Sequence, residues 1–231
     1  MSSQTTKSPS SPWQQTLTAV KANLVPGLIL QAFALVLVLA YYFNPATHHA
    51  LDIIAEFKNK MGWRYSIPAT GIFGGLIPSL FLRLNPRTRD ATPYSHVVFY
   101  ILFWAYKGFE VDQFYQFQGW LFGNETTFLI ISKKVFVDQF GYTGLYSVPT
   151  AAVIYYWKDS GFQFSSLKNL NWIAFQKTNL PKALLATWVV WIPSVAIIYS
   201  LPGPLQIPLF NIVLCFYSFL YITLMSAQKQ S

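Results

Sequence analysis

The residues of this sequence that could do chemistry are polar side chains within otherwise apolar segments. Asp138 is the only charged residue between positions 135 and 157. Four polar residues follow it at the i, i+4, i+7, i+11 spacing of one helix face: Gln139, Thr143, Tyr146 and Thr150. Lys107 and Glu110 are three residues apart, so they can pair on a helix surface. Because charged groups are costly in lipid, these residues indicate a buried site or a contact between helices.

The polar face that begins at Asp138 must meet other helices or water. Hydrogen bonding between helices is the common use of Ser, Thr and Gln side chains in membranes, and the lining of a pore is the alternative. Lys133 and Lys134 mark a membrane interface just before this helix. We therefore expect Asp138 to lie near one interface or to pair with a Lys or Arg residue, and Gln139 to point inward.

Enzyme signatures do not occur in the sequence. There is no Gly-x-Ser-x-Gly elbow, no phosphate-binding loop, no His-Glu-x-x-His pair and no Rossmann glycine cluster. The single cysteine, Cys215, permits neither an intrachain disulfide nor a Cys-based metal site. An intramembrane enzyme would have to use Glu110, Asp112 or Asp138, whose spacing matches no acid and base pair. We predict no enzymatic activity, no catalytic residue, no cofactor and no metal site.

The composition indicates a membrane protein. Hydrophobic residues make up 53% of the chain and charged residues only 10%, whereas soluble domains carry about 25% charged residues. The formal charge is +8, but the Lys and Arg residues are scattered between apolar runs, which suits the positive-inside bias of membrane loops and not a nucleic-acid surface. Counted over six spans, this bias weakly favours both termini on the inner side.

Three charge-free runs, residues 25–43, 183–201 and 205–225, each have the length of about 20 residues that a span needs. The turn Leu201-Pro202-Gly203-Pro204 joins the last two into a predicted helical hairpin. We therefore expect an all-α protein, a polytopic transmembrane helix bundle of about four to six spans. Residues 1–24 are predicted to form a polar N-terminal tail, 25–226 a single transmembrane domain and 227–231 a C-terminal tail.

The remaining segments are less regular. Residues 44–64 carry acidic and basic groups and are predicted to form an exposed or interfacial helix. Residues 67–82 either span or re-enter, and their Gly71-x-x-x-Gly75 spacing favours close helix contact. The polar residues in the second half of 94–123 point to every side of a helix, so that half is buried against protein or interfacial. Lysines and aromatic residues in 158–182 suit an amphipathic helix on an anionic leaflet.

Residues 133–226 contain an ordered series of motifs. A basic pair precedes Asp138-Gln139, and two tryptophans three residues apart, Trp188 and Trp191, lie near a proline. Three further positions follow the second tryptophan at intervals of eleven, nine and six residues: Pro202, Asn211 and Tyr217. This series resembles the Mpv/PMP family of small peroxisomal and mitochondrial inner-membrane proteins, which also has bacterial relatives. The sequence differs from the family pattern at Gly144, Val195, Ile198 and Gln206.

The resemblance implies a multi-pass protein of a bacterial plasma membrane or an organelle inner membrane that acts as a weakly selective channel for small solutes. The alternative is a non-conducting bundle that organises the membrane or binds a partner. The residues predicted to line a pore or a helix interface are Asp138, Gln139, Thr143, Tyr146, Thr150, Trp188, Trp191 and Asn211. The expected partner is the lipid bilayer, with small solutes and a further copy of the chain as candidates and no nucleic acid.

Overall fold

The structure, a computed structural model, describes residues 12–175, 177 and 180–228. Within these ranges all regular secondary structure is helical. This confirms the prediction of an all-α helix bundle. The predicted tails lie partly outside the described residues, and the described part of the N-terminal tail is helical because α1 already begins at Pro12.

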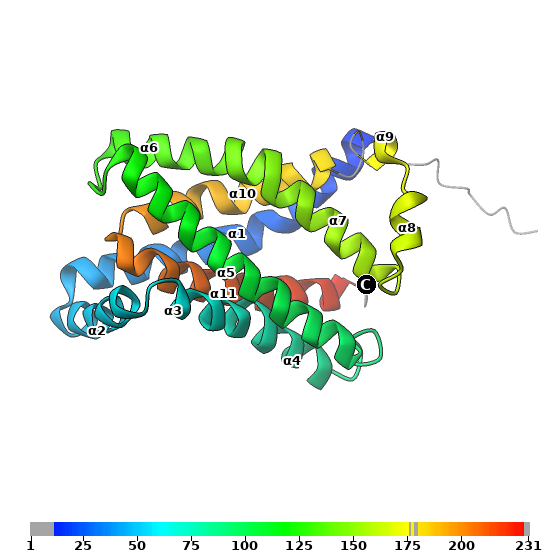
Figure 1. The fold of residues 1–231 in the computed structure, drawn as a ribbon, viewed down its shortest axis with the longest axis horizontal. Helices are drawn as coiled ribbons and strands as arrows, with labels where there is room; N and C mark the ends of the chain where they lie inside the picture. Colours follow the sequence, from blue (N-terminus) through cyan, green and yellow to red (C-terminus); the bar gives the residue numbers. More distant parts are fainter. Residues whose placement is uncertain (1–11, 176, 178–179, 229–231) are drawn as a thin grey trace, which may run out of the picture.

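Six long helical segments cross the described part of the molecule in alternating directions (Figure 1). They are α1 (Pro12–Phe43), α3–η1–α4 (Trp63–Thr70, Gly71–Leu76 and Ile77–Leu84), α5 (Tyr94–Phe122), α6–η2–α7 (Phe128–Phe136, Val137–Ser147 and Val148–Asp159), α10 (Leu180–Tyr199) and α11 (Gly203–Gln228). Helix α2 (Pro45–Met61) lies at one end of the bundle, and the short helices α8 (Phe164–Lys168) and α9 (Trp172–Ala174) lie at the other.

Among the described residues, three helices are long and apolar enough to cross a membrane: Asn23–Phe43, Trp63–Leu84 and Leu180–Tyr199, with Gly203–Phe219 as a shorter apolar helix. Their outward faces carry large apolar side chains, since Leu28 and Val36 of α1 are exposed while Leu30, Ala34 and Val38 of the same helix are buried. An apolar exterior of this kind is suited to lipid. The protein is therefore membrane-embedded.

The predicted hairpin is present as α10 and α11, which are separated only by residues 200–202. Residues 67–82, for which either a span or a re-entrant loop was expected, belong to the helix Trp63–Leu84, which is long enough to cross a membrane and does not turn back. The π-helical stretches η1 and η2 interrupt two of the long α-helical segments, η1 in this one and η2 in the one that contains Asp138.

The glycine pair in η1 brings two helices close together, as its spacing predicted. A Cβ atom on Gly75 would lie 2.6 Å from the carbonyl oxygen of Tyr100 on α5, and one on Gly71 would lie 3.2 Å from the Cβ of Ala105. Gly108 does the same from the side of α5, because a Cβ atom on it would collide with the main-chain oxygen of Ser66 on α3. Because backbones without side chains approach closely, α5 is held against α3 and η1 along its first half.

Residues 158–182 do not form the single amphipathic helix expected from their composition. Helix α7 ends at Asp159, where Gly161 and Phe162 both have positive φ values of 72° and 61°. Between this turn and the start of α10 at Leu180 lie the separate short helices α8 and α9. Lys158 is not a surface anchor either, because it is buried and donates to the hydroxyl of Tyr100.

Candidate functional site

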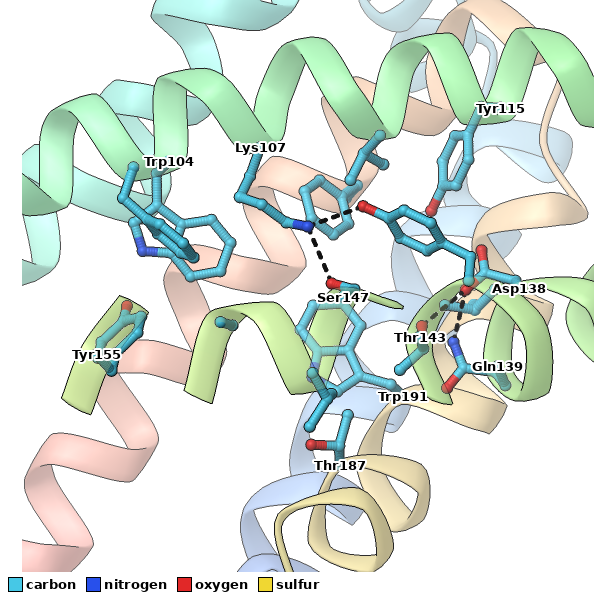
Figure 2. A pocket seen from close by; sticks show the side chains of 17 residues that line it. Trp104, Lys107, Tyr115, Asp138, Gln139, Thr143, Ser147, Tyr155, Thr187 and Trp191 are labelled. Atoms are coloured by element: carbon cyan, nitrogen blue, oxygen red, sulfur yellow. Dashed lines mark hydrogen bonds between the residues drawn. The ribbon is translucent and has the colours of Figure 1, made fainter. Parts of the chain in front are cut away.

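A cavity of about 200 Å³ lies between α5, the η2–α7 segment, α10 and α11, and it is partly open to the surroundings (Figure 2). We call it the internal cavity. It contacts α10 at Thr187, Trp191 and Val195, which lie in the middle of a candidate span. Its other lining residues are Phe103, Trp104, Lys107, Val111, Tyr115, Asp138, Gln139, Tyr142, Thr143, Ser147, Val148, Ala151, Tyr155 and Phe210.

The Asp138 carboxylate is 4% exposed and is held by three neutral hydrogen-bond donors. Oδ2 accepts from the Tyr199 hydroxyl at 2.7 Å, and Oδ1 accepts from Gln139 Nε2 at 2.8 Å and from Thr143 Oγ1 at 3.3 Å. Such bonds to a charged acceptor are stronger than bonds between neutral groups, so they offset much of the cost of burial. Two of these donors come from the same helical segment as Asp138, and the third ties that segment to α10.

Two alternatives were predicted for Asp138, a position near an interface or a pair with a basic residue. Tyr199 is the last residue of a candidate span, so its hydrogen bond to Asp138 places the carboxylate level with the end of that span. Among the described residues, no Lys, Arg or His nitrogen lies within 4.0 Å of it. Lys134, one helical turn before Asp138, lies over the Tyr199 ring, 5.8 Å from its centroid. The position therefore agrees with the first alternative, and direct ion pairing does not occur.

Gln139 points inward, as expected, and is 1% exposed. Its side-chain Oε1 has no hydrogen-bond partner among the residues that the structure describes. Its main-chain oxygen accepts a hydrogen bond from the indole nitrogen of Trp188 at 3.0 Å. Gly144 allows this contact, because a Cβ atom there would lie 3.2 Å from the Gln139 carbonyl oxygen and 3.5 Å from the Trp188 ring.

Lys107 and Glu110 form the ion pair that their spacing predicted. The Lys107 ammonium also donates to the hydroxyls of Tyr142, at 2.9 Å, and Ser147, at 3.0 Å (Figure 2). Tyr142 donates to the same Glu110 carboxylate. This network joins α5 to η2, so the pair is a bridge between two helices as well as a local contact.

The predicted polar face is divided by the π-helix. In η2 the main-chain hydrogen bonds run over five residues, as from the Val148 N–H to the Thr143 carbonyl. A π turn holds more residues than an α turn, so the α-helical spacing no longer defines one face. Gln139 and Thr143 line the internal cavity. Tyr146 lies on the exposed side and Thr150 bonds to the main chain of its own helix.

The three predicted residues of the hairpin have separate environments. Trp191 lines the internal cavity and packs against Phe210. Trp188 lies beside the cavity wall, in contact with Phe140 and the Gln139 main chain. Asn211 is buried outside the cavity lining and accepts a hydrogen bond from Thr70 at 2.8 Å. The structure thus brings Asp138, Gln139, Thr143 and Trp191 to one site and places Asn211 in a different helix contact.

Sequence reasoning missed a second buried ion pair. Lys58, which was expected in an exposed or interfacial helix, is 6% exposed and donates to both oxygens of Asp112 at 3.0 Å. The Ser66 hydroxyl donates to the same carboxylate at 2.7 Å. The partners are 54 residues apart, so no local spacing could have indicated the pair.

A second hollow, of about 280 Å³, lies where α2 ends and α11 begins. We call it the surface hollow. It is lined by Lys58, Asn59, Gly62, Asp112, Tyr115, Gln116, Asn124, Gly203, Pro204, Gln206 and Ile207. Tyr115 lines both this hollow and the internal cavity. Its ring packs against Tyr199, with 5.0 Å between the ring centroids.

No protein-family model matches this sequence, and no curated protein or solved structure gives a significant match.

Proposed function

We propose that this chain is a multi-pass integral membrane protein through which small solutes pass by way of the internal cavity. The observation that carries this proposal is the position of Tyr115, which lines both the internal cavity and the surface hollow. Rotation of this one side chain would join a polar hollow at the end of the bundle to a cavity beside the middle of α10. A continuous wetted path is what conduction requires.

The arrangement of charged residues supports six crossings. Helix α5 and the α6–η2–α7 segment are also long enough to cross, and both contain charged residues. Three of those charged side chains, Lys107, Asp112 and Asp138, are buried and bonded to neighbouring helices, so lipid is not in contact with them. Polar groups turned inward in this way are typical of helices that cross a membrane within a bundle.

The resemblance of residues 133–226 to the Mpv/PMP family points in the same direction. It favours a weakly selective channel in a bacterial plasma membrane or an organelle inner membrane. Its Asp-Gln motif corresponds to Asp138 and Gln139, which line the internal cavity.

A second candidate function is a non-conducting bundle that organises the membrane or binds a partner. The observation in its favour is that buried polar groups bond across helices, as in Thr70 with Asn211, Tyr199 with Asp138 and Lys58 with Asp112. In this case the polar residues serve only to hold helices together.

Flux measurements on proteoliposomes separate the two functions. The purified chain is reconstituted and the entry of uncharged solutes of increasing size, from urea and glycerol to sucrose, is followed by light scattering. We expect the smaller solutes to enter faster than into empty liposomes. Replacing Tyr115 with Ala should increase the rate and raise the size limit, because the partition between the two hollows is then removed.

Phe117→Ala is the matched control, since Phe117 lies two residues further along α5 and is exposed. It should leave the flux unchanged. If neither the natural chain nor folded Tyr115→Ala passes any solute faster than empty liposomes do, conduction is refuted and the packing function is the one that stands.

A further inference from the structure

We infer that the internal cavity is a binding site for a small protonated amine that carries an aromatic or other apolar group. This inference deepens the proposed function and rests on it, since it names the class of solute that the cavity selects. The argument depends on which polar groups of the cavity are already committed to hydrogen bonds inside the protein and which are not.

The only lysine in the cavity lining cannot serve as an anion site. The Lys107 ammonium has three protons, and it donates to three acceptors within the protein: Glu110, Tyr142 and Ser147. Its charge is balanced by the adjacent Glu110 carboxylate. A ligand carboxylate or phosphate would have to displace one of these bonds, so the cavity offers an anion no free cationic donor.

Hydrogen-bond acceptors, by contrast, remain available. Asp138 accepts only and has no basic partner within 4.0 Å among the described residues. Within the described part of the chain, Oδ2 accepts one hydrogen bond, from Tyr199, whereas a carboxylate oxygen has room for two. The cavity therefore contains a carboxylate that is bonded only to neutral donors and can accept a further hydrogen bond.

The second available acceptor is the Gln139 amide oxygen. Because a carboxylate can only accept, the Gln139 amide must turn its nitrogen toward Asp138, which leaves Oε1 at the other end of the group. Figure 2 shows this orientation, with the amide oxygen directed away from Asp138. Gln139 is 1% exposed, and no group in the described part of the chain donates a hydrogen bond to Oε1. An unpaired buried acceptor is costly, so a donor brought by a ligand would be favoured here.

Aromatic rings make up much of the rest of the wall, together with smaller aliphatic and hydroxyl side chains. Rings from α5, α7, α10 and α11 surround the cavity: Phe103, Trp104, Tyr155, Trp191 and Phe210. Aromatic faces attract cations as well as apolar groups, and the attraction is strongest where water is excluded. A volume of about 200 Å³ is below the range of about 300–1,000 Å³ found for drug-sized ligands. A ligand with one ring and one ammonium group matches both the size and the chemistry.

Three probes of nearly the same shape test this inference: benzylammonium, benzyl alcohol and benzoate, which differ mainly in charge. Binding to the full chain in lipid nanodiscs is measured by calorimetry at neutral pH. We expect benzylammonium to bind about tenfold or more tightly than benzyl alcohol, because a charged donor adds to the hydrogen bond. Benzoate should not bind.

Asp138→Asn is the variant that isolates the carboxylate. It should weaken benzylammonium binding by about tenfold or more while changing benzyl alcohol binding little. Thr150→Ala, outside the cavity, is the control and should bind as the natural chain does. Even if Asp138→Asn does not fold, the comparison of benzylammonium, benzyl alcohol and benzoate on the natural chain still tests the inference. Equal binding of the three probes, a preference for benzoate, or no binding of benzylammonium overturns the inference.

The binding result and the flux result can fail separately. If uncharged solutes pass but benzylammonium shows no preference, the amine site is wrong and the proposed function stands. If benzylammonium binds with the predicted preference but no solute passes in proteoliposomes, the site is a binding site and the proposed conduction is wrong.

Discussion

Replacing Tyr199 with Phe removes one hydroxyl group that two buried side chains share. The Tyr199 hydroxyl donates to Asp138 Oδ2 at 2.7 Å and accepts from Gln118 Nε2 at 2.6 Å. Gln118 and Asp138 are 0% and 4% exposed, so water cannot readily replace the lost partner. The phenyl ring keeps its packing against Tyr115 and its place below the Lys134 ammonium. The variant therefore tests the hydroxyl group alone.

The magnitude follows from the two bonds. A hydrogen bond to a charged group contributes about 1.5–3 kcal/mol and one between neutral groups about 0.5–1.5 kcal/mol. Interhelical polar contacts in membranes average nearer 0.6 kcal/mol, because side chains find other partners when helices separate within the bilayer. Since both partners of Tyr199 stay buried and lose their bond at once, we expect Tyr199→Phe to lower the free energy of unfolding by about 2–4 kcal/mol.

The assay is reversible unfolding in mixed detergent and lipid micelles, with Tyr42→Phe as the matched control. The Tyr42 hydroxyl donates to the Ser200 carbonyl oxygen at 2.6 Å, but this bond is exposed to the surroundings. The control should lose only about 0.5 kcal/mol because water can take over the bond. If Tyr199→Phe costs no more than Tyr42→Phe, the Asp138 network does not stabilise the bundle and the reasoning about this carboxylate is refuted.

Three further predictions concern the frame around the site. Gly75→Ala should lower the free energy of unfolding by about 1–3 kcal/mol, because its new Cβ would lie 2.6 Å from the Tyr100 carbonyl oxygen. The control Gly203→Ala should leave the free energy of unfolding unchanged in the same assay, because a Cβ there would have no atom within 4 Å. Lys58→Met should lower the free energy of unfolding by about 3–5 kcal/mol, because it leaves the Asp112 carboxylate buried without its cation. Adding Asp112→Leu should restore much of the lost stability. A double variant no more stable than the single variant would contradict the pairing. A cysteine at Gly203, the first residue of α11 directly after the turn from α10, should react with a membrane-impermeant thiol reagent from one side of the membrane only, and protection from both sides would count against the hairpin.

The membrane-crossing frame could be predicted from sequence because it depends on local properties. Charge-free runs of about 20 residues define spans, and the structure places crossing-length apolar helices at Asn23–Phe43 and Leu180–Tyr199, which overlap two of the predicted runs. The ion pair of Lys107 with Glu110 was predictable for the same reason, since its partners are three positions apart on one helix.

The site itself was predicted only in part. Asp138, Gln139, Thr143 and Trp191 were selected and do line the internal cavity. Tyr146 was selected with them on the assumption of α-helical phase, which the π-helical hydrogen bonds of η2 change. Nothing in the hydrophobic pattern distinguishes a π turn from an α turn at this point.

Contacts between distant parts of the chain could not be inferred from one sequence. Lys58 and Asp112 meet across 54 residues, and Asp138 and Tyr199 meet across 61. Their side chains become neighbours only after α2, α5, η2 and α10 have packed. The role of Tyr115 as the side chain common to two hollows also depends on this packing, so an aromatic residue in the second half of α5 gave no signal of its own.

The central claim, that solutes pass through the internal cavity, is tested most directly by blocking that cavity chemically. In a Cys215→Ser background, a cysteine replaces Thr187, which lines the cavity from α10. Proteoliposomes then take up glycerol before and after modification with a small methanethiosulfonate reagent, with a cysteine at Thr150 as the control outside the cavity. We predict that modification at position 187 abolishes glycerol flux and that modification at position 150 leaves it unchanged. Undiminished flux through a chain fully modified at position 187 would contradict the claim.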